Sequence, residues 1–214
     1  MMRKILLSAV LFAASGAATA GPITFSEGFD DVSTLAASGW LTPNYSTAGG
    51  ETGWFQGNAG VFTSDSGADD SYIAANFLGA PVGGNIDNWL VTPLFAVSEG
   101  STISFATRTN GEYPDTLEVL WSLGSADVAD FMSITTLTGA NFPLDWTNVN
   151  LVASGLQQSI RLAFRYLVTD TSVNGDYVGI DSFEVRAVPE PGTVALFGTA
   201  FLLMAFAVRR RKQI

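Results

Sequence analysis

Apolar and polar residues alternate through the middle of the chain. Positions 160, 162, 164, 166 and 168 are apolar, and the arginines Arg161 and Arg165 lie between them. The same period of two recurs at 103–107 and 117–121. Because successive side chains of a strand point to opposite faces, the pattern predicts half-buried antiparallel strands. Further strands are expected at 23–29, 72–77, 89–91, 146–152 and 178–185.

Turn-forming residues separate these expected strands, and helical segments are few. Gly, Asn, Asp and Pro punctuate the intervals, for example at 79–84. Only two short stretches have a helical pattern: 31–37, with Asp31 as its N-cap, and 126–132. Many short strands with turn-rich links predict an all-β fold, a jelly-roll-like antiparallel β-sandwich that occupies residues 21–187.

The last expected strand changes phase within its length. Val178 and Ile180 share one parity, whereas Phe183 and Val185 have the other. One extra residue near Asp181 reconciles the two halves, so the sequence predicts a β-bulge there. Bulges re-aim side chains, and this makes Asp181 a candidate for a specific role.

The first 20 residues have the three parts of a secretory signal peptide. Arg3 and Lys4 form a basic start, residues 5–14 are apolar, and Ala18-Thr19-Ala20 is a small-x-small cleavage site. We therefore expect residues 1–20 to be removed before Gly21 on export.

The C-terminal residues 188–214 combine an apolar stretch with a basic tail. Residues 193–208 carry no charge and predict a transmembrane helix about 24 Å long. That is short for a hydrocarbon core of about 30 Å, which favours a transient tether over a lasting anchor. The basic residues 209–212 are expected to stay cytoplasmic, with the domain at 21–187 outside the membrane.

The segment between these two ends is strongly acidic. Residues 21–188 contain four Arg and no Lys against 19 Asp and Glu, a formal charge of −15 compared with −10 for the whole chain. Such a surface repels nucleic acid and anionic headgroups, so neither is an expected partner. It also offers many oxygen ligands to divalent cations.

Several classes of enzyme are excluded by the residues that the chain lacks. Without any His or Cys it has no Ser-His-Asp or Cys-His nucleophile, no disulfide, and no imidazole or thiolate for zinc. Residues 21–188 also lack the Lys that Schiff-base chemistry needs. A carboxylate pair for glycoside hydrolysis remains open, but no pair is marked by its context. We therefore expect a non-enzymatic protein.

The C-terminal segment resembles the PEP-CTERM sorting signal. Val188, Pro189, Glu190 and Pro191 precede the apolar stretch, and the basic tail follows it. The resemblance implies processing by an exosortase, a membrane-embedded transpeptidase-like enzyme of Gram-negative bacteria that make extracellular polysaccharide. It also implies a destination at the cell surface or in the extracellular matrix.

Residues 24–186 resemble the choice-of-anchor J domain. The resemblance implies a jelly-roll sandwich similar to cleaved-adhesin and MAM domains, and it implies no known reaction. It rests on these motifs, in order: Phe25-x-Glu27-x-Phe29-Asp30-Asp31, Gly39-Trp40, Gly53-Trp54-Phe55-Gln56-Gly57, Ser71-Tyr72-Ile73-Ala74, Asn88-Trp89-Leu90-Val91-Thr92-Pro93, Ile103-x-Phe105-x-Thr107-Arg108, Leu117-x-Val119, Ala163-Phe164-Arg165-Tyr166 and Gly179-Ile180-Asp181.

A structural calcium ion is one hypothesis for the acidic residues. The first and last strands of such sandwiches usually lie side by side, which would bring Glu27 near Asp181. Asp30 and Asp31 could add ligands from the following turn, since Ca²⁺ takes six to eight oxygens. Related jelly rolls are similar in placing calcium there. Capping and strand-end hydrogen bonds are the alternative use of the same carboxylates.

Glycan binding is the main alternative to a purely adhesive role. Of the five Trp, we expect Trp121 and Trp89 in the core, because buried Trp is ordinary in a sandwich. Trp54 lies in a Gly-rich loop and is the candidate for stacking on a sugar. The leading hypothesis is an adhesion or interaction module with exosortase as its processing partner. A lectin-like module that binds exopolysaccharide or surface glycans is the second, and a carboxylate-based glycoside hydrolase is the third.

Overall fold

The structure, a computed structural model, describes residues 21–188. The expected signal peptide at 1–20 and the sorting segment from 189 onward lie outside the described residues. Pro22–Val188 form one compact unit. Within this range, no helix has the length and apolar character needed to cross a membrane.

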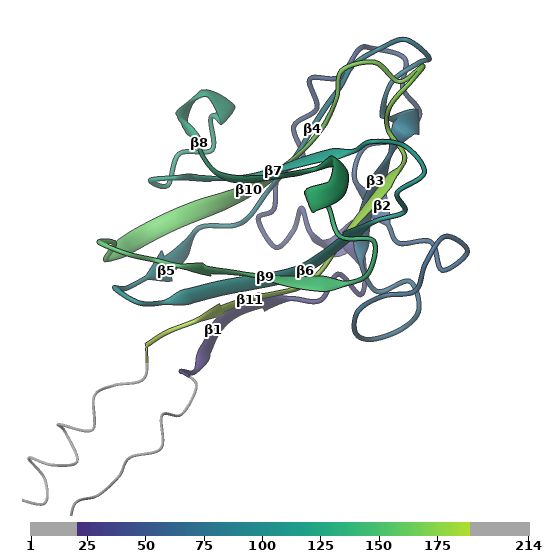
Figure 1. Ribbon diagram of the computed structural model, residues 1–214. Helices are drawn as coiled ribbons and strands as arrows, with labels where there is room; N and C mark the ends of the chain where they lie inside the picture. The colour runs from purple at the N-terminus through teal and green to yellow at the C-terminus, as the bar shows by residue number, and fades with distance from the viewer. Residues whose placement is uncertain (1–20, 189–214) are drawn as a thin grey trace, which may run out of the picture. The chain divides into compact units, whose positions relative to one another are not determined.

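Two antiparallel sheets make up this unit, and each is named here by its central strand (Figure 1). The β11 sheet has the order β2-β3-β11-β6-β9, with β1 also beside β11, and the β10 sheet has the order β4-β10-β7-β8, with β5 also beside β10. The predicted all-β antiparallel sandwich is confirmed. The strands are β1 (Ile23–Glu27), β2 (Phe55–Gln56), β3 (Ile73–Asn76), β4 (Ile86–Val91), β5 (Phe95–Val97), β6 (Thr102–Thr109), β7 (Thr116–Ser122), β8 (Met132–Thr138), β9 (Thr147–Val152), β10 (Gln158–Val168) and β11 (Tyr177–Arg186).

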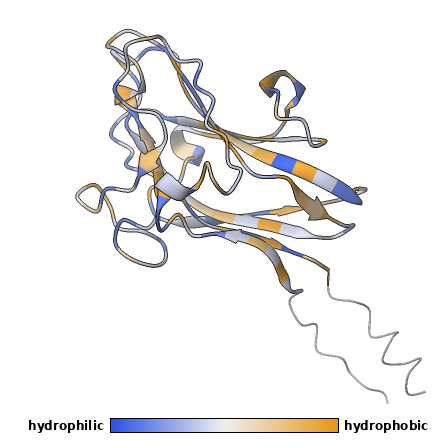
Figure 2. Ribbon diagram, turned by 180° about the vertical axis from the view of Figure 1, so that it is seen from behind, coloured by the Kyte–Doolittle hydropathy of each residue, from blue (hydrophilic) through white to orange (hydrophobic). Residues whose placement is uncertain are grey.

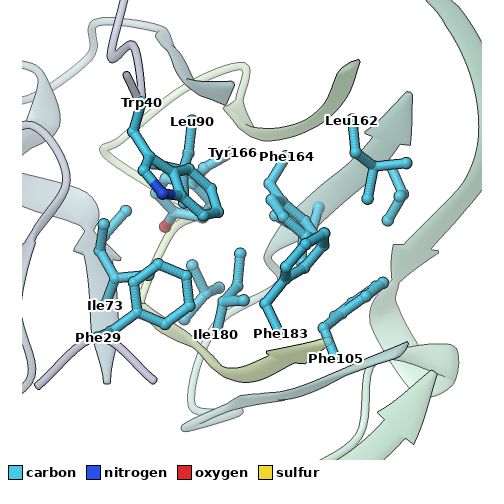
Figure 3. Packing of buried hydrophobic residues seen from close by; sticks show 14 of the residues in the cluster. Phe29, Trp40, Ile73, Leu90, Phe105, Leu162, Phe164, Tyr166, Ile180 and Phe183 are labelled. Carbon is cyan, nitrogen blue, oxygen red and sulfur yellow. The ribbon is translucent and has the colours of Figure 1, made fainter. Parts of the chain in front are cut away.

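The main hydrophobic core lies between the two sheets. The alternating residues of β10 from Ile160 to Val168 are buried there, as their period of two predicts. Figure 2 shows hydrophobic and hydrophilic residues alternating along the strands. Phe105 of β6 meets Phe164 of β10 edge-on, with ring centroids 4.8 Å apart. Trp40 packs edge-on against Phe183 and Phe29 (Figure 3). Each fully buried side chain of this kind stabilises the fold by about 1.5–3 kcal/mol.

The outer faces of both sheets carry smaller apolar clusters. On the β11 sheet, Phe62 packs on Tyr72, Tyr177 and Trp146. On the β10 sheet, Trp89 lies with Val91, Leu120 and Ala163, and Val128 and Phe131 pack over them. Trp89 is therefore buried, with 4% of its surface exposed, but against an outer face and not between the sheets.

The bulge in β11 occurs where the phase change predicts it. The register between β11 and β6 shifts between Asp181 and Glu184, and Ser182 has a φ of +53°. The left-handed backbone at Ser182 is uncommon for a residue other than Gly. The same bulge lies beside β1, whose Glu27 pairs with Phe183. The expectation that the first and last strands are neighbours is thus confirmed.

The helical expectations were too long. The stretch at 31–37 contains only a 3₁₀ turn, η1 (Val32–Thr34), which Asp31 caps by accepting the Ser33 N–H at 3.0 Å. The stretch at 126–132 contains only η3 (Val128–Asp130), and β8 begins at its end. Two other 3₁₀ turns are η2 (Phe77–Gly79) and η4 (Gly139–Asn141).

Candidate functional site

A cavity of about 290 Å³ lies where β1 meets the bulge of β11. Three of the four predicted calcium ligands, Glu27, Asp30 and Asp181, line it. We call it the Asp181 cavity. The fourth, Asp31, is used as the cap of η1. The pairing of β1 with β11 explains why residues so distant in sequence meet.

Asp181 lines this cavity and is fully buried. Its Oδ2 accepts the backbone N–H groups of Asp65 at 2.9 Å and Ser66 at 3.0 Å, and its Oδ1 accepts that of Ser182 at 2.5 Å. Burial raises the pKa of Asp181 to about 6 despite these three donors. Glu27 is also engaged, because its Oε1 accepts the Phe29 N–H at 2.9 Å.

The cavity fits a calcium ion only in part. Among residues 21–188 no group of three or more acidic side chains is placed to hold a metal ion. Calcium needs six to eight oxygens, so backbone carbonyls and hydroxyls would have to complete a site built on Asp181 and Asp30. The calcium hypothesis stays a prediction, with Asp31 removed from the expected ligands because it caps η1.

None of the five Trp is an exposed large side chain. Trp54 is half-buried and packs against the main core, and its indole N–H is buried without a hydrogen-bond partner. Trp121 is half-buried and lines an apolar cavity of about 400 Å³ between the sheets. The stacking role of Trp54 therefore stays a prediction that its packing does not favour.

Of the four predicted sorting residues, only Val188 is described. It follows β11 and lies beside Gly100: a Cβ added to Gly100 would be 3.1 Å from the Cγ2 of Val188. Pro189, Glu190 and Pro191 lie outside the described residues.

A second region, at the end of the sandwich formed by the β6–β7 and β10–β11 loops, was missed by sequence reasoning. Three cavities of about 210, 360 and 250 Å³ adjoin there. Phe77 and Thr171 line both the first and the middle cavity, and Glu112 and Tyr113 line both the middle and the third. We call this row of cavities the loop-end groove.

Two aspartates hold the loops around this groove. Asp115 is buried, and its carboxylate accepts the Tyr166 hydroxyl, the Thr109 hydroxyl and the Asp176 N–H at 2.6, 2.6 and 2.9 Å. The Asp176 carboxylate in turn accepts the Glu112 N–H at 2.8 Å. Burial raises the pKa of Asp115. The network joins the β6–β7 loop to the β10–β11 loop.

The signal for this region in the sequence is slight. Tyr113 follows Gly111, which has a φ of +85° and could not accept a Cβ without striking Leu144 at 2.3 Å. Pro114 follows directly. An aromatic residue inside a Gly–Pro turn is the one local hint, and it is a weak one, because buried aromatics such as Trp40 and Tyr72 also lie outside the strands.

Comparison with protein families identifies the C-terminal segment. Residues 187–212 match the family described as the PEP-CTERM protein-sorting motif. The chain thus carries the sorting motif that its sequence resembles. A search of the curated proteins found no similar protein.

Solved structures similar to this chain include two cleaved adhesin domains of Lys-gingipain from Porphyromonas gingivalis. The K3 domain has a TM-score of 0.57 and 17% identity, covering 78% of this chain and 99% of that domain. The K1 domain has a TM-score of 0.56 and 20% identity, covering 76% and 97%. The expected likeness to cleaved-adhesin domains is therefore confirmed, and at these identities it shows the fold alone.

Proposed function

We propose that this protein is exported, sorted and cleaved at its C-terminus by an exosortase, and displayed at the cell surface or in the extracellular matrix as a non-enzymatic adhesion module. The observation that carries the proposal is the sorting motif at 187–212. It begins at the residue after β11, which ends at Arg186. The motif therefore starts where the sandwich ends, and cleavage there would release the sandwich without cutting any of its strands.

The charge distribution supports export of the domain across the inner membrane, with the basic tail left on the cytoplasmic side. The sandwich region carries −15, whereas residues 209–212 are all basic. Basic residues stay on the cytoplasmic side, and the strongly negative net charge of the acidic region repels anionic headgroups. The 16 uncharged residues at 193–208 would tether the chain for long enough to be cleaved.

An adhesive role is supported by what the described residues offer. The fold is that of the cleaved adhesin domains of Lys-gingipain. The chain lacks the His and Cys that activated nucleophiles of many hydrolases require. We therefore place binding before catalysis.

The test is fractionation with intact-mass analysis in cells with and without the exosortase. We expect the mature protein to lack both the first 20 residues and everything after the motif in wild-type cells, and to keep residues 193–208 in membranes when the exosortase is absent. Glu190→Ala should block cleavage, whereas the matched change Glu184→Ala, in the strand before the motif, should not. Retention of the C-terminal segment in wild-type cells would replace sorting by a plain membrane anchor.

A further inference from the structure

We infer that the loop-end groove is a carbohydrate-binding site for an uncharged polysaccharide chain, with Phe77 and Tyr113 as its stacking residues. The inference rests on the proposed adhesion function, because it names the ligand that the module would hold. It does not depend on the sorting step. The argument uses the shape, surface chemistry, charge, rigidity and location of the groove.

The shape of the groove suits a chain more than a single sugar. Three cavities follow one another, and each pair of neighbours shares wall residues. Phe77 stands at the first junction and Tyr113 at the second. An elongated ligand could therefore cross all three cavities and pass an aromatic ring twice.

The two aromatic rings are unusually exposed for this protein. Phe77 has 47% of its surface exposed and Tyr113 has 55%, whereas most of the other aromatic residues within 21–188 are buried. An aromatic face packs well on the C–H groups of a pyranose ring, while the sugar hydroxyls need polar partners around it. Glu112, Ser172 and Asn174 line the middle cavity and supply such partners.

The charge around the groove selects against acidic polysaccharides. Glu51, Glu112 and Asp176 line it, and no Lys or Arg lines any of its three cavities. An anionic chain would meet repulsion here and from the −15 surface as a whole. An uncharged polysaccharide avoids this cost and can still donate hydroxyl hydrogens to the carboxylates.

The groove is held in shape by bonds among the loops that form it. Asp176 accepts the Glu112 N–H, its own backbone carbonyl accepts the Phe77 N–H at 3.0 Å, and the Gly175 N–H donates to Pro114 O at 3.1 Å. Thr171 bonds to the 80–84 turn through its hydroxyl, which donates to Pro81 O at 2.6 Å. A preorganised site loses little conformational entropy on binding.

The groove also lies at the end of the sandwich opposite the sorting motif. Strand β11 begins at Tyr177, directly after the groove residue Asp176, and ends at Arg186, where the sorting motif follows (Figure 1). Its ten residues span about 33 Å. The binding site is thus separated from the attachment end by the length of the sandwich.

The test uses the full-length chain, because the result must not depend on cleavage. The chain is kept in a polyoxyethylene detergent, because sugar-based detergents would compete with the polysaccharide for the groove. Affinity electrophoresis against neutral polysaccharides (glucans, mannan, galactan, xylan and the neutral fraction of the producing organism) is run beside alginate and dextran sulfate. We expect retardation by at least one neutral polymer and by neither anionic one. Phe77→Ala and Tyr113→Ala should each weaken that binding about tenfold or more.

The matched control is Tyr45→Ala. Tyr45 has 57% of its surface exposed, close to the value for Tyr113, and it lines none of the three groove cavities. This change should leave binding within twofold. The inference is overturned if no neutral polymer retards the protein, or if the anionic polymers retard it as strongly. It is also overturned if Tyr45→Ala weakens binding as much as Tyr113→Ala. A chain that binds glycan but keeps its C-terminus would refute sorting alone, and a cleaved chain without binding would refute the groove alone.

Discussion

The two cavity regions each contain a buried carboxylate, and the two carboxylates are used differently. Asp115 lies under the loop-end groove and is held by two side-chain hydroxyls and one N–H, all neutral donors. Asp181 is held only by backbone N–H groups and shares its cavity with Glu27 and Asp30. Burial raises the pKa of both. The difference lies in the neighbours: Asp115 joins the loops under the groove, whereas Asp181 joins the 65–66 loop to β11 and has two further carboxylates, Glu27 and Asp30, around its cavity.

The largest effect should follow from removing the Asp115 carboxylate. Asp115→Ala leaves the Tyr166 hydroxyl, the Thr109 hydroxyl and the Asp176 N–H without their acceptor in a buried site. We expect the free energy of unfolding to fall by about 3–4 kcal/mol, measured by urea denaturation.

Asp115→Asn is the control for this change. The new amide keeps an oxygen for Tyr166 and Asp176, and its NH₂ can donate to Thr109, whose hydroxyl hydrogen can turn to Tyr177 O at 3.2 Å. The loss should therefore be about 1 kcal/mol. Equal losses for the two variants would show that the carboxylate does not work as a shared acceptor.

The next largest effect is a pH dependence from Asp181. The folded state has a pKa of about 6 for this group, above the ordinary value of 3.8. Between about pH 4 and pH 6 the folded state therefore holds a proton that the unfolded chain has released. This contribution is fully present below about pH 4 and is lost as the pH rises through 6, so the domain should gain about 2–3 kcal/mol on going from pH 7 to pH 4 in chelator.

Thermal unfolding of two charge-matched variants checks this assignment. Asp181→Asn should reduce the gain in stability between pH 7 and pH 4 and leave the part that comes from the raised pKa of Asp115, whereas Asp69→Asn, at an exposed position, should keep the full gain. If both variants behave like the wild type, the pH dependence has another origin, such as relief of the general −15 repulsion.

Most of the fold could be predicted from alternation, but the edges and loops could not. β10 has strict alternation because one face meets the core, and the phase change at Asp181 located the bulge. β8 was not predicted from the sequence. It is an edge strand whose residues are mostly exposed on both faces, so its sequence lacks a period of two. The sequence indicated Trp54 as the stacking residue and did not point to Tyr113. A Gly-rich loop reveals nothing about whether its aromatic residue folds back onto the core.

A third prediction concerns calcium at the Asp181 cavity, which we propose as a binding site built on Asp181 and Asp30. A ligand that binds only the folded state stabilises it by about 1.4 kcal/mol at ten times its Kd. Calcium should therefore raise the Tm, and Asp181→Asn should abolish this rise. Asp31→Asn should preserve the rise, since Asp31 caps η1. An unchanged Tm in calcium and in chelator would leave the cavity as a structural feature of the bulge.

The smallest effect is expected at the loop-end groove itself. Phe77→Ala and Tyr113→Ala remove side chains that are about half exposed, so each should lower the free energy of unfolding by only about 1 kcal/mol. Phe105→Ala, in the main core, should by contrast cost about 3–5 kcal/mol. Urea denaturation of the three variants separates the two uses of aromatic residues in this protein. If the groove variants lose as much stability as Phe105→Ala, their rings belong to the packing of the loops and any loss of glycan binding would follow from unfolding. If they lose only about 1 kcal/mol each, a loss of binding must come from the contact with the sugar.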